Sequence, residues 1–124
     1  MANILVIDDQ AWACDLCREG LAGEGHRVSA TDDVDLVRKN VLSFKSDLVI
    51  LNLYLKHGFC VFDVLRDIKM QNPNLPVLIV TAYDTYLNDS RLSQADGYVV
   101  KSSFAGNELK QKIATLLSRE PVIN

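Results

Sequence analysis

Short apolar segments alternate with segments of helical spacing along the whole chain, and this alternation restricts the fold more than any other feature of the sequence. The apolar segments are rich in Val, Ile and Leu, as strands buried on both faces are. They predict strands at residues 4–7, 28–31, 48–51, 76–80 and 97–100. Apolar residues at helical spacing predict helices at residues 13–21, 34–42, 61–68 and 109–117, and the more polar stretch 83–95 gives the weakest helix pattern.

Five strand–helix units in strict alternation predict an α/β domain with one parallel sheet covered by helices on both faces. Because crossovers between parallel strands are right-handed, few strand orders remain. Strands of this number and length suit the doubly wound, flavodoxin-like order 2-1-3-4-5. The 124 residues are one domain's length. We expect the domain to span residues 1–119, with residues 120–124 as a C-terminal tail or the start of a linker.

Composition and charge argue against several classes of function. The net charge of −3 favours no polyanionic partner, because nucleic-acid binding usually needs a basic patch. No apolar run approaches the ~20 residues that cross a bilayer. The N-terminus lacks the basic start of a signal peptide, and its apolar run stops at Asp8 and Asp9. Three cysteines, an odd number, do not indicate a disulfide framework. We therefore expect a cytoplasmic protein that binds neither membranes nor nucleic acid directly.

Polar residues stand directly after four of the predicted strands. They are Asp8 and Asp9, Asn52, Thr81, and Lys101. Each has a simpler explanation when taken alone, because an acid after a strand is a common helix cap, a threonine fits a turn and a lysine fits the surface. The carboxyl ends of parallel strands form the ligand crevice of an α/β sheet, however. The set therefore predicts one pocket with two carboxylates, an amide, a hydroxyl and an ammonium group.

This set of groups favours a metal ion and a phosphoryl group. Two adjacent carboxylates repel each other and are best accommodated around a hard cation such as Mg²⁺, which prefers oxygen ligands. The hydroxyl of Thr81 and the ammonium of Lys101 suit the oxygens of a phosphoryl group.

With these motifs the chain resembles the receiver domain (chemotaxis-regulator-like) of bacterial two-component response regulators. The resemblance covers residues 3–118 and rests on Asp8-Asp9, on residues 47–52, on Thr81-Ala82 and on residues 97–101. It implies phosphorelay signalling, in which a histidine kinase or phosphotransfer protein passes a phosphoryl group to an aspartate at the end of the third strand. An output domain or partner protein would act downstream. Homodimerisation through the last helix and the fifth strand is typical of the family.

The resemblance also implies a role for each residue of the pocket. The implied magnesium ligands are Asp8, Asp9, Asn52 and the backbone carbonyl of Tyr54. The implied phosphoryl contacts are Thr81 and Lys101, and the implied switch residues are Thr81 and Tyr98. Tyr98 also fits an ordinary core residue of the fifth strand.

Asn52 stands at the position of the family's phosphoacceptor aspartate. A carboxamide is a far poorer nucleophile than a carboxylate and cannot form the acyl phosphate, so we expect no phosphorylation there. The amide also removes one negative charge from the metal site. Mg²⁺ should therefore bind more weakly than in a site with three carboxylates, or not at all.

Two explanations of Asn52 remain open. One is an engineered Asp→Asn change that silences an ordinary receiver. The other is a natural pseudo-receiver that acts as a phosphorylation-independent interaction module. The loop 53–59 lacks the family's proline and Asp-Gly pair, and Ser102 replaces the family's proline after Lys101. A cis bond costs ~2.5–4 kcal/mol before serine and ~0.5–1 before proline. Because an engineer would change only residue 52, these departures favour natural divergence.

Other motifs give weaker signals. Cys14 and Cys17 form a C-x-x-C inside a predicted helix rather than at its start, which favours a structural role. His57, beside Asn52, fits an exposed loop residue better than a metal ligand. A flavodoxin-like protein that binds a phosphate cofactor would need a small-residue phosphate loop after the first strand, where this chain has two acids. No G-x-G-x-x-G or P-loop motif occurs, so we expect no enzyme.

Overall fold

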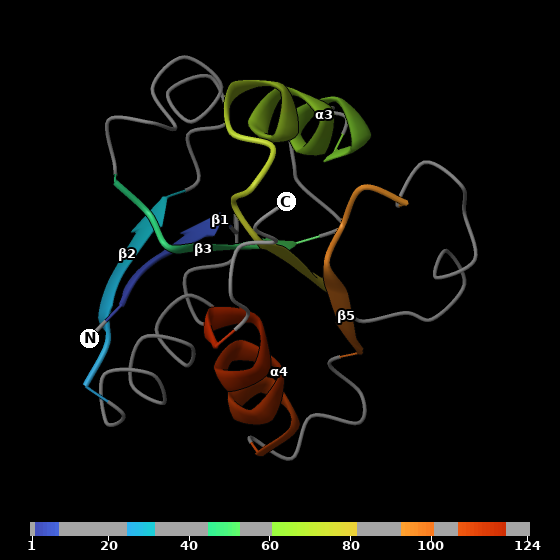
Figure 1. The fold of residues 1–124 in the computed structure, drawn as a ribbon. Helices are drawn as coiled ribbons and strands as arrows, with labels where there is room; N and C mark the ends of the chain where they lie inside the picture. Colours follow the sequence, from blue (N-terminus) through green and yellow to red (C-terminus); the bar gives the residue numbers. More distant parts are fainter. Residues whose placement is uncertain are drawn as a thin grey trace, which may run out of the picture.

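The computed structural model describes residues 2–7, 25–31, 45–52, 61–81, 93–100 and 107–118. The strands in these ranges are β1 (Asn3–Ile7), β2 (Arg27–Thr31), β3 (Leu48–Asn52), β4 (Val77–Thr81) and β5 (Gly97–Val100). The helices are α3 (Val61–Gln71) and α4 (Asn107–Leu117). All strands run parallel in one sheet of order β2-β1-β3-β4-β5 (Figure 1), which confirms the predicted flavodoxin-like order.

The predicted strands and two of the predicted helices are confirmed to within a few residues. β2 begins one residue earlier than predicted and β4 one residue later. α3 extends to Gln71, three residues beyond the predicted end. α4 begins at Asn107, two residues before the predicted start, because its polar first residues show no apolar spacing in the sequence. The helices predicted at residues 13–21 and 34–42, and most of the stretch 83–95, lie outside the described residues. Residues 93 and 94 form a turn, and neither they nor residue 95 belong to a helix.

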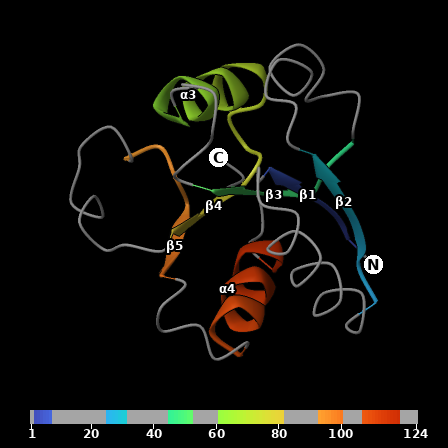
Figure 2. The same cartoon turned by 180° about the vertical axis from the view of Figure 1, so that it is seen from behind.

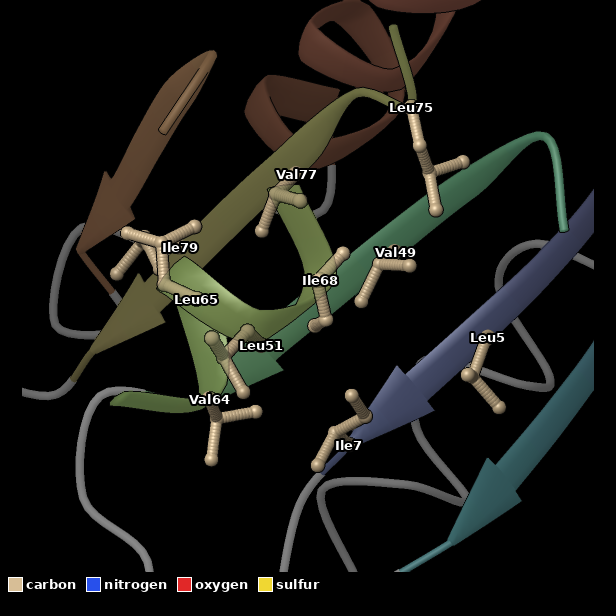
Figure 3. Packing of buried hydrophobic residues seen from close by; sticks show 10 residues of the cluster. All are labelled: Leu5, Ile7, Val49, Leu51, Val64, Leu65, Ile68, Leu75, Val77 and Ile79. Carbon is tan, nitrogen blue, oxygen red and sulfur yellow. The ribbon is translucent and has the colours of Figure 1, made fainter. Parts of the chain in front are cut away.

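The sheet is covered by α3 on one face and by α4 on the other (Figures 1 and 2). Successive side chains of a strand point to opposite faces, so β1, β3 and β4 supply both layers. The layer under α3, which we call the α3-side core, is made of ten buried residues. They are Leu5, Ile7, Val49, Leu51, Val64, Leu65, Ile68, Leu75, Val77 and Ile79 (Figure 3).

The layer under α4 uses the alternate residues of the same strands. Its members are Ile4, Val6, Leu48, Ile50, Leu78, Val80, Val99, Ile113 and Leu116. Full burial of one aliphatic side chain stabilises a fold by about 1.5–3 kcal/mol. Because β1, β3 and β4 bury both faces, their sequences are continuously apolar, and this is why their positions were predictable from sequence.

β2 and β5 are the outer strands of the sheet. Arg27 and Ser29 of β2 are exposed, which an outer strand tolerates because one of its edges lies open. Neither helix in the described part of the chain is long and apolar enough to span a membrane.

Candidate functional site at the carboxyl end of the sheet

The pairing of β3 with its neighbours fixes the place of Asn52. β1 and β3 pair Ile7 with Leu51, and these residues directly precede Asp8 and Asn52. On its other side β3 pairs Asn52 with Val80, the residue before the end of β4. Neighbouring strands lie about 4.8 Å apart. The backbone of residue 52 is therefore placed between the end of the strand that leads to the acidic pair and the end of β4.

The next pairing places the other half of the predicted pocket. Thr81 is the last residue of β4 and pairs with Val100, the last residue of β5. Lys101 follows directly in the sequence. The strand order at this end of the sheet thus has β3, which ends at Asn52, between β1 on one side and β4 and β5 on the other.

Asn52 itself is buried, with 4% of its surface exposed. Among the residues whose side chains the structure describes, no other polar residue is buried. Its strand neighbours Leu51 and Val80 are buried as well. A carboxylate in this position would lose most of its hydration, and such a loss is tolerated only beside a cation or hydrogen-bond donors. A polar side chain in this position is therefore held by interactions within the protein or with a bound group rather than by bulk water.

Several residues of the predicted site lie outside the described residues. They are Asp8, Asp9, Tyr54 and Lys101, together with Cys14, Cys17 and His57 of the weaker signals. The backbone of Thr81 is described, as the end of β4. Within the described ranges no group of three His, Cys, Asp or Glu residues could hold a metal ion. That finding does not extend to the acidic pair, so the predicted ligand set stays a prediction.

Tyr98 lies in β5, opposite Ile79 of β4. Its side chain is half-buried and packs against the α3-side core. Burial raises the pKa of the Tyr98 hydroxyl above its ordinary value of 10.0, and the negative charge of Asp96 raises it further. Both descriptions of Tyr98 from sequence, as a core residue and as a switch residue, are compatible with this position.

A charged network at the opposite end of the sheet was not predicted. The ammonium of Lys69, near the end of α3, lies 2.6 Å from a carboxylate oxygen of Asp96, just before β5. A signal was present in the sequence, because Lys69 follows Leu65 by four residues and therefore lies on the buried side of the helix. Because charged residues are usually exposed to solvent, the sequence alone did not lead us to predict an ion pair between Lys69 and Asp96.

An open hollow of about 470 Å³ also lies at the amino ends of the strands. It is lined by Ala2, His26, Asp47, Asn74, Pro76, Leu116 and Leu117. These residues precede the strands or belong to α4, so the hollow is separate from the predicted pocket at the carboxyl ends.

The sequence of the chain matches the model of a known protein family and is similar to individual proteins of that kind. Residues 4–114 match the family "Response regulator receiver domain". The two-component response regulator PhoP of Pseudomonas aeruginosa is 30% identical over 119 residues, which cover 94% of this chain and 52% of PhoP. The transcriptional regulator NtrC of Bradyrhizobium sp. is 30% identical over 96 residues, or 77% of this chain and 20% of NtrC. The chain thus spans about half or less of these relatives.

Solved structures share the fold. The response regulator protein TrrA of Thermotoga maritima, in complex with Mg²⁺-BeF, matches with a TM-score of 0.86 and 34% identity. The match covers 94% of this chain and 99% of TrrA. TrrA in complex with the histidine kinase ThkA matches with a TM-score of 0.84 and 34% identity, covering 95% of this chain and all of TrrA (100%).

Proposed function

Because the chain belongs to the response regulator receiver domain family, we propose that it is a two-component receiver domain that cannot accept a phosphoryl group while residue 52 is asparagine. The supporting observation is the buried position of Asn52 between the ends of β1 and β4. A side-chain carboxylate there would attack phosphorus, but the amide nitrogen and oxygen of Asn52 offer no comparable nucleophile. The proposed domain spans residues 1–119.

The pocket residues fit a magnesium ion, and the chemistry of the donor set is the reason. Asp8, Asp9, the side-chain oxygen of Asn52 and the carbonyl of Tyr54 are all oxygen ligands, which Mg²⁺ prefers. When bound, the ion neutralises charge on transferring phosphoryl oxygens. Asn52 contributes a neutral oxygen, so we expect weaker binding than in a site with a third carboxylate. The structure of TrrA was determined with Mg²⁺-BeF, which supports a metal site in this fold.

The remaining pocket residues have proposed roles on the phosphoryl side. The hydroxyl of Thr81 donates a hydrogen bond to a phosphoryl oxygen, and the ammonium of Lys101 offsets its negative charge. Thr81 and Tyr98 then form the switch that reports the state of the site. The order of strands supports this division, because β4 and β5 lie on the side of β3 opposite β1.

The proposed upstream partner is a histidine kinase or a phosphotransfer protein. TrrA, which matches this chain over nearly its whole length, was determined in complex with the histidine kinase ThkA. Downstream we propose an output domain or a separate partner protein. The relatives include regulators such as NtrC, named as DNA-binding, of which this chain matches only a part. Direct nucleic-acid binding is therefore not assigned to the residues of this chain.

A second candidate function is a natural pseudo-receiver that binds its partner without phosphorylation. The observation that favours it is the set of sequence departures around Asn52. The loop 53–59 has neither the proline nor the Asp-Gly pair of the family, and Ser102 follows Lys101. In this case the domain would keep one conformation. Its signal would then depend on the amount of protein present or on an input other than phosphorylation.

Phosphoryl acceptance by residue 52 is the test of the proposed function. The parent protein and Asn52→Asp are incubated with acetyl phosphate and Mg²⁺, and intact masses are recorded. We expect only Asn52→Asp to gain the mass of one phosphoryl group, as an alkali-labile acyl phosphate. The matched control is Asn52→Asp combined with Asp9→Asn, which removes a proposed metal ligand and should abolish the gain.

The outcomes separate the two candidates. A gain in Asn52→Asp alone supports a receiver silenced at one side chain. No gain in either protein supports the pseudo-receiver, whose site has diverged beyond residue 52. A phosphoryl group on the parent protein would contradict both, because residue 52 would then not be the acceptor.

A further inference from the structure

Four groups from three parts of the chain meet at the amino end of the sheet. The ammonium of Lys69 donates to a carboxylate oxygen of Asp96 at 2.6 Å and to the carbonyl of Leu75 at 2.7 Å. The same oxygen of Asp96 accepts the backbone N–H of Val77 at 2.8 Å. We call these four residues the Lys69–Asp96 clamp. It joins the last turn of α3 to the segment before β4 and to the residue before β5.

The clamp is shielded enough for its charges to matter. The side chains of Lys69 and Asp96 are 10% and 18% exposed. By contrast, the pair between Arg66 and Asp63 on the outer face of α3 is 56% and 48% exposed. Solvent screens an exposed pair and weakens it, whereas a shielded pair keeps more of its attraction and leaves a costly unpaired charge when one partner is removed.

The clamp also fixes the register of β5. Asp96 donates its own backbone N–H to the carbonyl of Val77 at 2.9 Å, so the two residues exchange two hydrogen bonds. The first β4–β5 pair, Leu78 with Gly97, follows at once. A Cβ atom on Gly97 would lie 3.2 Å from Cδ1 of Leu78, so the strands pack closely there. A slip of one residue would turn the side chain of Tyr98 to the other face of the sheet.

Tyr98 is two residues beyond Asp96, with its ring against the α3-side core. α3 supplies both the helical part of that core and Lys69. The helix therefore contacts the region of Tyr98 in two ways, through apolar packing and through the ion pair. The raised pKa of Tyr98, caused by burial and then by Asp96, is consistent with this coupling.

We propose that the Lys69–Asp96 clamp is a positioning device that ties β5 to α3 and holds the side chain of Tyr98 in its place against the α3-side core. The significance for signalling rests on the proposed function, in which Tyr98 is a switch residue. α3 is the next described element after β3, which ends at Asn52. A displacement of α3 caused by events at residue 52 is thus passed to β5 through Lys69 and Asp96, at the end of the sheet far from the acceptor.

The test measures the pKa of Tyr98 in variants that remove one charge at a time. Tyrosine ring-carbon signals are followed by NMR during alkaline titration, and Tyr98→Phe identifies the signal of Tyr98. In Asp96→Asn the negative charge is lost while an acceptor oxygen remains for Val77, so the pKa of Tyr98 should fall. In Lys69→Met the ion pair is lost although the charge of Asp96 remains, so a Tyr98 side chain held by the clamp is released from burial and its pKa should also fall. Lys69→Arg keeps a positive charge and should restore the parent value.

A fall of the Tyr98 pKa in both variants supports the proposal, because each variant breaks the clamp and frees the Tyr98 side chain from its buried place. A fall in Asp96→Asn with a rise in Lys69→Met would mean that the charge of Asp96 acts on Tyr98 directly and that the pair does not hold the side chain. That result, or no shift in either variant, overturns the proposal. If Lys69→Met does not fold, the hydrogen-exchange comparison in Asp96→Ala carries the test.

Hydrogen exchange gives an independent readout of the same coupling. In Asp96→Ala the Val77 amide loses its acceptor, and its exchange should be about tenfold faster or more. The Tyr98 amide should follow if the clamp holds β5, and unchanged exchange at Tyr98 would contradict the proposal. None of these measurements needs Mg²⁺ or a phosphoryl donor. Failure of the clamp proposal is therefore distinguishable from failure of the proposed function.

Discussion

The two ends of the sheet use polar residues in different ways. At the amino end, charged side chains hold backbone groups in place: Asp96 binds Lys69 and the amide of Val77, and Asp47 accepts the amide of Asn3 at 2.8 Å. At the carboxyl end, Asn52 is buried between β1 and β4, and the other polar positions of the proposed site stand at or directly after strand ends in the sequence.

We infer from this difference that polar residues at the amino end mainly stabilise the fold, whereas those at the carboxyl end mainly serve binding and reactivity. Charges at the amino end are matched by partners of the chain, so their loss should destabilise the protein. The proposed ligands at the carboxyl end include adjacent acids, which are costly without a cation. Changes there should alter binding and reactivity more than packing.

The largest effect is expected at the clamp. Asp96→Ala leaves the shielded ammonium of Lys69 and the N–H of Val77 without this acceptor. We expect a loss of about 3 kcal/mol in the free energy of unfolding, at the low end for buried pairs because both side chains keep some exposure. Asp63→Ala, which breaks an exposed pair with Arg66, should cost about 0–1 kcal/mol. Urea denaturation measures both free energies of unfolding. Equal losses would show that the exposure of an ion pair does not decide its contribution to stability.

The second effect concerns the carboxyl end. Asn52→Asp places a carboxylate at a 4%-exposed position, and without Mg²⁺ we expect a loss of roughly 1–3 kcal/mol in the free energy of unfolding. Mg²⁺ at 100 times its dissociation constant should return about 2.7 kcal/mol. Denaturation with and without Mg²⁺ tests this, with the parent protein as the control. A variant that does not respond to Mg²⁺ would argue against the metal site.

A smaller effect is expected at the start of β1. Asp47→Ala removes an exposed hydrogen bond to the backbone N–H of Asn3, and it should cost about 0.5–1.5 kcal/mol in the free energy of unfolding. Asp47→Asn keeps an acceptor oxygen and should lie closer to the parent. If Asp47→Ala destabilises the protein as much as Asp96→Ala, exposure does not set the scale at the amino end.

The smallest effect is the alkaline response of Tyr98. Its pKa is raised in the folded protein, so the unfolded chain loses this proton at lower pH and binds fewer protons. The contribution to stability is complete below pH 10 and is lost as pH rises through the folded-state pKa. Tyr98→Phe should therefore lose less stability between pH 9 and pH 11, roughly the range around the ordinary tyrosine pKa. An identical pH dependence in both proteins would contradict the burial of the hydroxyl.

The fold was predictable because strands buried on both faces leave a plain record in the sequence. Leu5, Ile50 and Ile79 are fully or almost fully buried, and each lies in an unbroken apolar segment. β2 was harder to delimit because it is an outer strand with exposed residues. Leu75, buried before β4, escaped prediction because proline and asparagine neighbours indicate a turn there.

Two positions of the candidate site, Asn52 and Thr81, were predictable from sequence as strand ends, and the rest of the site stays a prediction. Parallel pairing makes the residue after each strand end a neighbour of the next, and Asn52 and Thr81 lie where that rule places them. The Lys69–Asp96 pair could not be read from sequence, because residues 27 positions apart show no pattern that links them. Only the folded chain brings the end of α3 to the start of β5.

The most direct test of the contrast between the two ends is a Mg²⁺ titration of Asn52→Asp followed by backbone amide chemical shifts. We expect changes at the carboxyl end, at residues 51–52, 80–81 and 100, and none at Asn3, Val77 or Asp96. The parent protein should show the same pattern only at higher Mg²⁺ concentration. Shifts that centre on the amino end, or an equal Mg²⁺ affinity of the two proteins, would contradict a metal site that includes residue 52.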